Sequence, residues 1–131
     1  MRLTSLIIIF IALVVPAATG CGANPANEII FGQDEITVGE KKITVDLAIT
    51  GPQKSRGLKY RRKLAADRGM LFIYSHSTRS PFWMKDTHIP LSIAFIDGRG
   101  RIIGIEQMSP DNDETIYSPP GPFLYALEMN Q

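Results

Sequence analysis

The segment LSIAFIDGRGRIIGI, residues 91–105, carries the clearest folding signal in the chain. Its two apolar runs, residues 91–96 and 101–105, are rich in isoleucine, which favours β-strands. Between them stands Asp97-Gly98-Arg99-Gly100, and both aspartate and glycine tolerate the positive φ angles that tight turns between antiparallel strands require. The segment therefore predicts a β-hairpin.

Five more segments around the hairpin have the composition of short strands. They are residues 35–38, 43–49, 69–74, 80–87 and 123–129. In the second of these, every other residue from Ile43 to Ile49 is large and apolar, which predicts a strand with one buried face. Asp46 and Ala48 would then lie on its other, exposed face.

One short helix is expected between the second and third of these strands. Thr50 supplies a capping hydroxyl and Pro52 suits a first helical turn, so the helix should run from about Pro52 to Leu58. Many short strands with one short helix predict a mainly β fold, a small barrel-like β domain, over residues 34–131.

Residues 1–20 have the order of a secretory signal peptide. Arg2 is followed by the uncharged apolar run Leu6–Val15 and then by small residues. At about 1.5 Å per residue, this run covers only about half of a bilayer core of about 30 Å, which disfavours a permanent transmembrane helix.

Cys21, the only cysteine, directly follows Ala18-Thr19-Gly20, in the small-residue spacing of a bacterial lipoprotein signal. That spacing predicts cleavage before Cys21, lipidation of its thiol and anchoring in a membrane. Residues 21–33 would then be the lipidated cysteine and a tether, with the domain outside the cytoplasm, in the periplasm or on the cell surface. The alternative is a secreted soluble protein. In both cases the folded part has no cysteine, which excludes disulfides there.

The charge of the mature chain is balanced but unevenly distributed. Removal of Arg2 leaves 13 of the 14 basic residues against 13 acidic ones, whereas a general nucleic-acid binder needs excess positive charge. Seven basic residues nevertheless fall between Lys54 and Arg68, which we call the basic segment. This segment is either a solvated face or a surface for anionic lipid or acidic polysaccharide.

The candidate binding residues cluster around FWMKDT, residues 82–87, which includes the only tryptophan. Strand alternation would place Trp83, Lys85 and Thr87 on one face and Asp86 on the other. Trp83 could then serve as a flat platform and Lys85 as a partner for an anion or a sugar hydroxyl. Arg56, from the basic segment, is the fourth candidate binding residue.

A structural interpretation of the same stretch stays open. Phe82 and Met84 would be core residues, and Trp83 a partly buried cover for them. An ion pair between Arg56 and Asp67 would then hold the helix against the sheet.

Patterns for catalysis and metal binding are weak. Asp86 and Glu128 are the candidate acid and base of a carbohydrate-acting enzyme, but nothing in the sequence brings them within the roughly 5–9 Å that a two-carboxylate mechanism needs. His76 and His88 lack the spacing of metal ligands, and the acidic run 111–114 lacks the glycine and distal glutamate of a calcium loop. The sequence predicts no metal and no cofactor, and it favours a protein that is not an enzyme.

Several motifs together resemble the secreted family known as domain of unknown function 192. They are Arg56-Gly57-Leu58, Gly69-Met70-Leu71-Phe72, Phe82-Trp83-Met84-Lys85-Asp86-Thr87, Ile89-Pro90-Leu91 and Ala126-Leu127-Glu128-Met129-Asn130. The resemblance covers residues 36–131 and implies a compact, β-rich, barrel-like fold, usually behind a signal peptide or lipoprotein signal. It implies no particular activity.

Two differences from the family pattern bear on these expectations. Relatives usually have asparagine in place of Asp86 and aspartate in place of Ser92, so a carboxylate at the second position is missing here. Relatives also usually continue past the end of this chain, Gln131, into one more strand. This difference predicts a truncated C-terminus or an open sheet edge.

We therefore expect an envelope lipoprotein whose β domain binds a glycan, a lipid headgroup or a protein partner. The expected binding residues are Trp83, Lys85, Arg56 and Thr87. A carbohydrate-acting enzyme and a purely structural motif are the alternatives. The sequence does not indicate an oligomeric state or a nucleic-acid partner.

Overall fold

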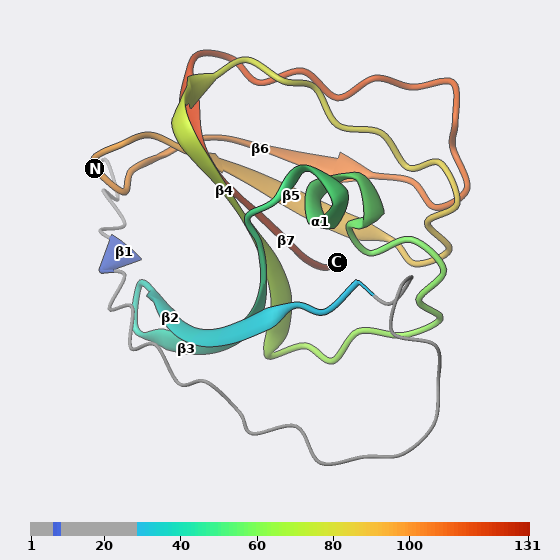
Figure 1. Ribbon diagram of the computed structural model, residues 1–131, viewed down its shortest axis with the longest axis horizontal. Helices are drawn as coiled ribbons and strands as arrows, with labels where there is room; N and C mark the ends of the chain where they lie inside the picture. Colours follow the sequence, from blue (N-terminus) through green and yellow to red (C-terminus); the bar gives the residue numbers. More distant parts are fainter. Residues whose placement is uncertain (1–6, 9–28) are drawn as a thin grey trace.

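The computed structural model describes residues 7–8 and 29–131, which form one β-sheet with a single short helix (Figure 1). The elements are β1 (Ile7–Ile8), β2 (Gly32–Val38), β3 (Lys41–Ala48), α1 (Gly51–Arg56), β4 (Arg68–Thr78), β5 (Leu91–Ile96), β6 (Ile102–Met108) and β7 (Phe123–Asn130). The predicted mainly β fold with one short helix is confirmed.

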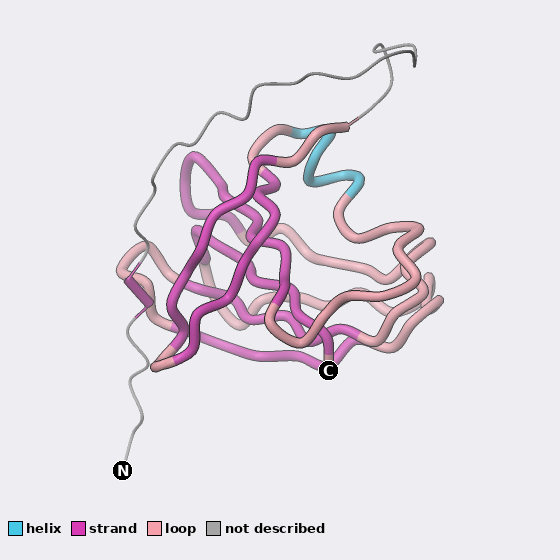
Figure 2. Tube along the Cα trace, turned by 90° about the horizontal axis from the view of Figure 1, so that it is seen from below, coloured by secondary structure: helices cyan, strands magenta, loops and turns pink. Residues whose placement is uncertain are grey.

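The sheet has the strand order β1-β2-β3-β4-β7-β5-β6, and among these pairs only β3 and β4 run parallel. Its two edges, β1 and β6, do not pair, so the sheet is open and barrel-like describes it only loosely. Figure 2 shows the helix and the long loops together at one side of the strands.

The predicted lipidation site and most of the predicted signal peptide and tether lie outside the described residues. Residues 7–8 form the short strand β1 against β2, with Ile7 opposite Val38. In the part of the chain that the structure describes, no helix is long and apolar enough to cross a bilayer.

The predicted hairpin is confirmed as β5 and β6. The carboxylate of Asp97 accepts hydrogen bonds from the backbone N–H groups of Arg99 (2.9 Å) and Arg101 (3.0 Å), which holds the turn. Gly100 has a φ of 77°, a conformation that glycine adopts without strain. The second strand extends to Met108, three residues beyond the predicted end.

The predicted helix is also confirmed, with a capping box at its start. The Thr50 hydroxyl accepts a hydrogen bond from the Gln53 N–H, and the Gln53 side-chain oxygen accepts one from the Thr50 N–H (2.9 Å). The helix ends at Arg56, two residues earlier than predicted, because Gly57 has a φ of 49°.

The prediction of one buried face for residues 43–49 was wrong. Ala48 is fully buried and Asp46 is 5% exposed, whereas Ile49 is 51% exposed. The bent sheet packs a separate hydrophobic cluster against each of its faces, so successive residues such as Ala126 and Leu127 enter different clusters. A strand in the middle of such a sheet is covered on both sides, as β3 is.

The prediction of a strand over residues 80–87 was also wrong. This stretch is a loop with a single β-bridge, in which Phe82 and Tyr117 exchange two backbone hydrogen bonds of 2.9 Å. The alternation holds only at the start, where Phe82 and Met84 are buried and Trp83 is exposed. It fails beyond Met84 because a turn follows, in which Asp86 has a φ of 55° and the Thr87 N–H donates to the Met84 carbonyl.

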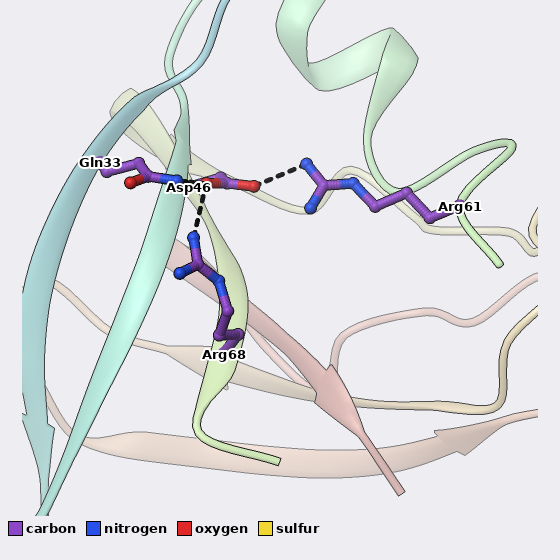
Figure 3. Close-up of polar contacts among 4 residues, drawn as sticks. All are labelled: Gln33, Asp46, Arg61 and Arg68. Carbon is purple, nitrogen blue, oxygen red and sulfur yellow. Dashed lines mark hydrogen bonds and ion pairs between the residues drawn. The ribbon is translucent and has the colours of Figure 1, made fainter. Parts of the chain in front are cut away.

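The buried carboxylate of Asp46 ties the basic segment to the sheet (Figure 3). One oxygen accepts a hydrogen bond from the Arg61 guanidinium at 2.6 Å. The other accepts one from the Gln33 amide at 2.8 Å and lies 3.7 Å from the Arg68 guanidinium. Since a carboxylate removed from water needs such partners, this contact fixes the path of the chain after α1.

Replacing the Asp46 carboxylate should therefore weaken the fold. Asp46→Asn should lower the free energy of unfolding by about 1–3 kcal/mol, because the buried site loses its charge-assisted hydrogen bond from Arg61. The matched control is Glu35→Gln, which breaks the exposed Glu35–Lys42 ion pair and should lower the free energy of unfolding by much less. Urea unfolding followed by circular dichroism measures both changes, and equal losses would contradict this role for Asp46.

Candidate functional site

A small pocket opens next to α1, where the residues after the helix meet the 82–87 loop and the sheet. We call it the Glu128 pocket, and its volume is about 40 Å³. Leu58, Phe72 and Phe82 form its apolar wall. Its polar lining includes Arg56, Lys59, Trp83, Thr87 and Glu128.

Glu128 lies in β7, opposite Met70 of β4 and Ile93 of β5, and so occupies an interior strand of the sheet. Its side chain is 5% exposed, and no hydrogen bond or ion pair joins it to another side chain within residues 29–131. In this same part of the chain, every side-chain oxygen or nitrogen that is fully inaccessible to solvent has a hydrogen-bond partner. The Glu128 carboxyl oxygens have no such partner, so they are not fully inaccessible and must reach the pocket that Glu128 lines.

Burial raises the pKa of Glu128 from 4.5 to about 8. The low-dielectric surroundings penalise the ionised form, and no cation contacts the carboxyl closely enough to offset that penalty. At neutral pH the carboxyl is therefore mostly protonated and can donate a hydrogen bond into the pocket.

Cations surround the tryptophan at the rim of this pocket. Trp83 is 47% exposed, and the ammonium groups of Lys59 and Lys85 lie 5.5 and 5.7 Å from its ring centre. The Arg56 guanidinium lies 4.8 Å from the ring centre of Tyr60. Within the described residues, Arg56, Lys59 and Lys85 form no ion pair, so no acidic side chain there neutralises their charges.

The structure brings most of the predicted binding residues together. Trp83, Arg56 and Thr87 line the Glu128 pocket, and the Lys85 ammonium group, which does not line it, lies 5.7 Å from the centre of the Trp83 ring. Thr87 is buried, and its hydroxyl donates to the Lys85 carbonyl at 3.2 Å. Thr87 therefore holds the loop, whereas the side chains of Trp83, Arg56 and Lys85 are exposed.

The two predicted carboxylates do not share the pocket. Glu128 lines it, but Asp86 does not. The Asp86 carboxylate instead lies 3.4 Å from the Tyr60 hydroxyl, and the Asp86 carbonyl accepts a hydrogen bond from the Tyr60 N–H at 2.8 Å. This arrangement gives no support to a mechanism in which Asp86 and Glu128 act on one bond.

The proposed ion pair between Arg56 and Asp67 does not form. Arg56 stacks on Tyr60, and Arg61 and Arg68 pair with Asp46 instead. The basic segment thus has two roles, because Arg61 and Arg68 anchor it while Arg56 and Lys59 line the Glu128 pocket.

Lys59 and the apolar wall were not predicted as parts of the site. Lys59 is one of seven basic residues in the basic segment, and nothing local distinguishes it from its neighbours. Glu128 carried a stronger signal, since it is the one charged residue in the apolar strand FLYALEM, residues 123–129. A charge at an interior strand position is uncommon unless it is paired or functional.

The histidines and the acidic run have structural contacts of their own. His88 Nδ1 lies 2.6 Å from a carboxylate oxygen of Asp111. The side-chain oxygen of Asn112 accepts hydrogen bonds from the backbone N–H groups of Glu114 and Thr115. No group of three or more histidine, cysteine or acidic side chains placed to hold a metal ion occurs in residues 7–8 and 29–131.

Comparison with known proteins gives a family match and several similar solved structures. The model of the DUF192 family, described as an uncharacterised ACR, matches residues 34–131. A Sinorhizobium meliloti protein described as a proposed transcription regulator is 32% identical, with a TM-score of 0.71 over 79% of this chain and 84% of that one. A Novosphingobium aromaticivorans protein of unknown function is 28% identical, with a TM-score of 0.67 over 86% of this chain and 82% of that one. No curated protein matches the chain.

The exposure of Trp83 can be tested directly, because it is the only tryptophan. Its emission should be close to that of indole in water, and iodide should quench it more strongly than caesium does. The reason is that Lys59 and Lys85 attract an anion to the ring and repel a cation. Steady-state quenching at matched ionic strength measures both, and a blue-shifted emission beyond the reach of iodide would contradict the exposed position.

The raised pKa of Glu128 should make stability fall as the pH rises from about 4.5 to about 8. In this range the unfolded state releases the proton while the folded state keeps it, so rising pH favours unfolding. Glu128→Gln removes this slope, and its stability relative to the wild type should increase by roughly 2–4 kcal/mol between pH 5 and pH 8.

The matched control for this measurement is Glu106→Gln, at an exposed glutamate on the edge strand β6. Urea unfolding at several pH values gives the slope for each protein. An unchanged slope in Glu128→Gln, or an equal change in Glu106→Gln, would contradict the assignment.

Proposed function

Because the chain belongs to the DUF192 family, which is described as uncharacterised, we propose its function from the Glu128 pocket: a non-enzymatic binding module for a glycan. The observation that carries this proposal is a half-exposed tryptophan with two lysine ammonium groups near its ring, lining the same pocket as a carboxyl group that has no side-chain partner in the described residues. Small-ligand sites combine an aromatic surface with a few placed polar groups in this way.

The chemistry of the rim suits a sugar ring. An indole offers a flat apolar surface for the C–H face of a sugar, and it loses little conformational entropy on binding. Arg56 and Lys85 can donate hydrogen bonds to sugar hydroxyls, and Glu128 can both accept and donate.

A lipid headgroup and a protein partner are the other ligands that this surface could take. A headgroup would use the cations but has no flat face for Trp83. The S. meliloti relative is described as a proposed transcription regulator, but the near-neutral charge of this chain does not favour DNA binding.

A second candidate function is acid catalysis on carbohydrate. Its support is the raised pKa of Glu128 in a pocket, which is the usual state of a catalytic acid at neutral pH. A two-carboxylate hydrolase would also need a second carboxylate in the pocket, and Asp86 does not lie there. Release of new reducing ends from a bound oligosaccharide would favour this function over binding alone.

We test the binding proposal with Trp83→Ala in the full-length chain. Isothermal titration calorimetry with a panel of envelope oligosaccharides should find at least one ligand whose affinity falls tenfold or more in the variant. Such a loss corresponds to about 1.4 kcal/mol, the scale of one aromatic contact. If no oligosaccharide binds, or if anionic lipid vesicles bind independently of Trp83, the glycan proposal fails.

A matched pair of lysine variants separates the pocket from general charge. Lys59→Ala should weaken glycan binding, because Lys59 lines the Glu128 pocket. Lys63→Ala removes an exposed lysine of the same basic segment that lines a different hollow, next to Arg61. It should leave the affinity within about twofold, and equal losses would point to a non-specific electrostatic surface.

For the cellular location, we propose that lipidated Cys21 holds the domain at a membrane outside the cytoplasm. The lipoprotein-like spacing before Cys21 supports this. Metabolic labelling with an alkyne fatty acid should mark the wild type and not Cys21→Ser, and the variant should leave the membrane fraction. Labelling that persists in Cys21→Ser would overturn the proposal.

A further inference from the structure

The base of the Glu128 pocket offers a place for one specific chemical group. Glu128 is only 5% exposed, its carboxyl group has no side-chain partner within residues 29–131, and its oxygens reach the pocket. Buried polar groups in proteins are nearly always hydrogen-bonded, so an unpartnered one that faces a pocket indicates a ligand or solvent partner.

We propose that the Glu128 pocket is a subsite for a carboxylate group of the ligand, which forms a hydrogen bond with Glu128 and pairs with Arg56 and Lys59. A hexuronic acid, whose sugar ring would lie against Trp83, combines both features. This inference rests on the proposed binding function.

The size of the pocket fits a carboxylate. Its volume of about 40 Å³ suits a small polar group of a ligand rather than a whole sugar ring, so the ring would lie outside the pocket against Trp83.

The charges around the pocket favour an anion. Arg56 and Lys59 line the pocket, and Lys85 lies close to Trp83, yet none of them pairs with Glu128 or with another acidic group in the described chain. An anionic group that enters between these cations gains their attraction without breaking an existing ion pair. Its attraction is strengthened because the surrounding wall is apolar.

Protonation decides whether the base of the pocket accepts this anion. A protonated Glu128 donates a hydrogen bond to a carboxylate, whereas an ionised Glu128 repels it. Two further titratable groups face Glu128, namely Tyr74 from β4 and Lys54 from α1. Burial raises the pKa of Tyr74 and lowers that of Lys54. On the β5 side, the residue opposite Glu128 is the uncharged Ile93.

The proposal gives a definite pH dependence. Because Glu128 keeps its proton up to about pH 8, affinity for a carboxylate ligand should be nearly constant below pH 7. Above pH 8 each further unit should cost about tenfold, so the affinity should fall about tenfold between pH 7 and pH 9. A neutral sugar should show no such fall.

The test is calorimetric titration of the full-length chain with trigalacturonate and with its neutral counterpart, the α-1,4-linked trisaccharide of galactose. At pH 7 trigalacturonate should bind at least tenfold more tightly, and only its affinity should fall towards pH 9. In Glu128→Gln the side chain is always neutral and still donates a hydrogen bond, so the affinity should no longer change between pH 7 and pH 9.

Lys54→Gln is the control for a neighbouring group whose pKa is lowered by burial. It should keep the pH dependence, because Glu128 is unchanged. If Lys54→Gln abolishes the dependence, or if Glu128→Gln retains it, the carboxylate subsite is overturned.

Two further results separate this inference from the proposed function. Equal, pH-independent binding of both trisaccharides would overturn the carboxylate subsite and keep the glycan module. If the peptide triglutamate binds with the same pH dependence and neither trisaccharide binds, the carboxylate subsite stands and the glycan proposal is overturned. Absence of binding by all three probes would overturn both.

Discussion

The buried carboxylate of Asp46 is the contact on which the candidate site depends. It joins three parts of the chain, since Gln33 comes from β2, Arg61 from the segment after α1 and Arg68 from the start of β4. Arg61 follows Leu58, a wall residue of the Glu128 pocket, by only three positions. An anion inside the fold requires its cationic partners in place, so the burial of Asp46 also fixes the path of the basic segment past the pocket.

The two buried carboxyl groups, Asp46 and Glu128, differ in whether they have side-chain partners. Asp46 has a partner for each oxygen, and its role is to hold the fold together. Glu128 has no side-chain partner in the described chain, and burial raises its pKa to about 8. Keeping such a group in an interior strand costs stability, and groups of this kind concentrate at functional sites. Glu128 therefore identifies the site more strongly than the exposed Trp83 does by itself.

How much the sequence predicted depended on how local the deciding contacts are. The hairpin at Asp97 and the helix cap at Thr50 were predicted correctly, because their hydrogen bonds join residues at most four positions apart. The prediction of a strand over residues 80–87 was wrong, because its composition suits a strand but its pairing with Tyr117 is one isolated bridge at Phe82. Trp83, Arg56 and Thr87 line one pocket and Lys85 lies beside Trp83, although not on one face of a strand, whereas Asp86 has a positive φ and does not line the pocket.

By itself, the sequence determined the mainly β class, the hairpin, the capped helix and the family. These follow from residue composition, turn chemistry and motifs that act over a few positions. Only the tertiary structure decided that the sheet stays open, that both faces of β3 are buried, and that Lys59, Trp83 and Glu128 surround one pocket. The physical reason is that strand order and burial are set by contacts between residues far apart in the chain. The pKa of Glu128 is likewise raised only in the folded chain, where the packed side chains remove the carboxyl group from water.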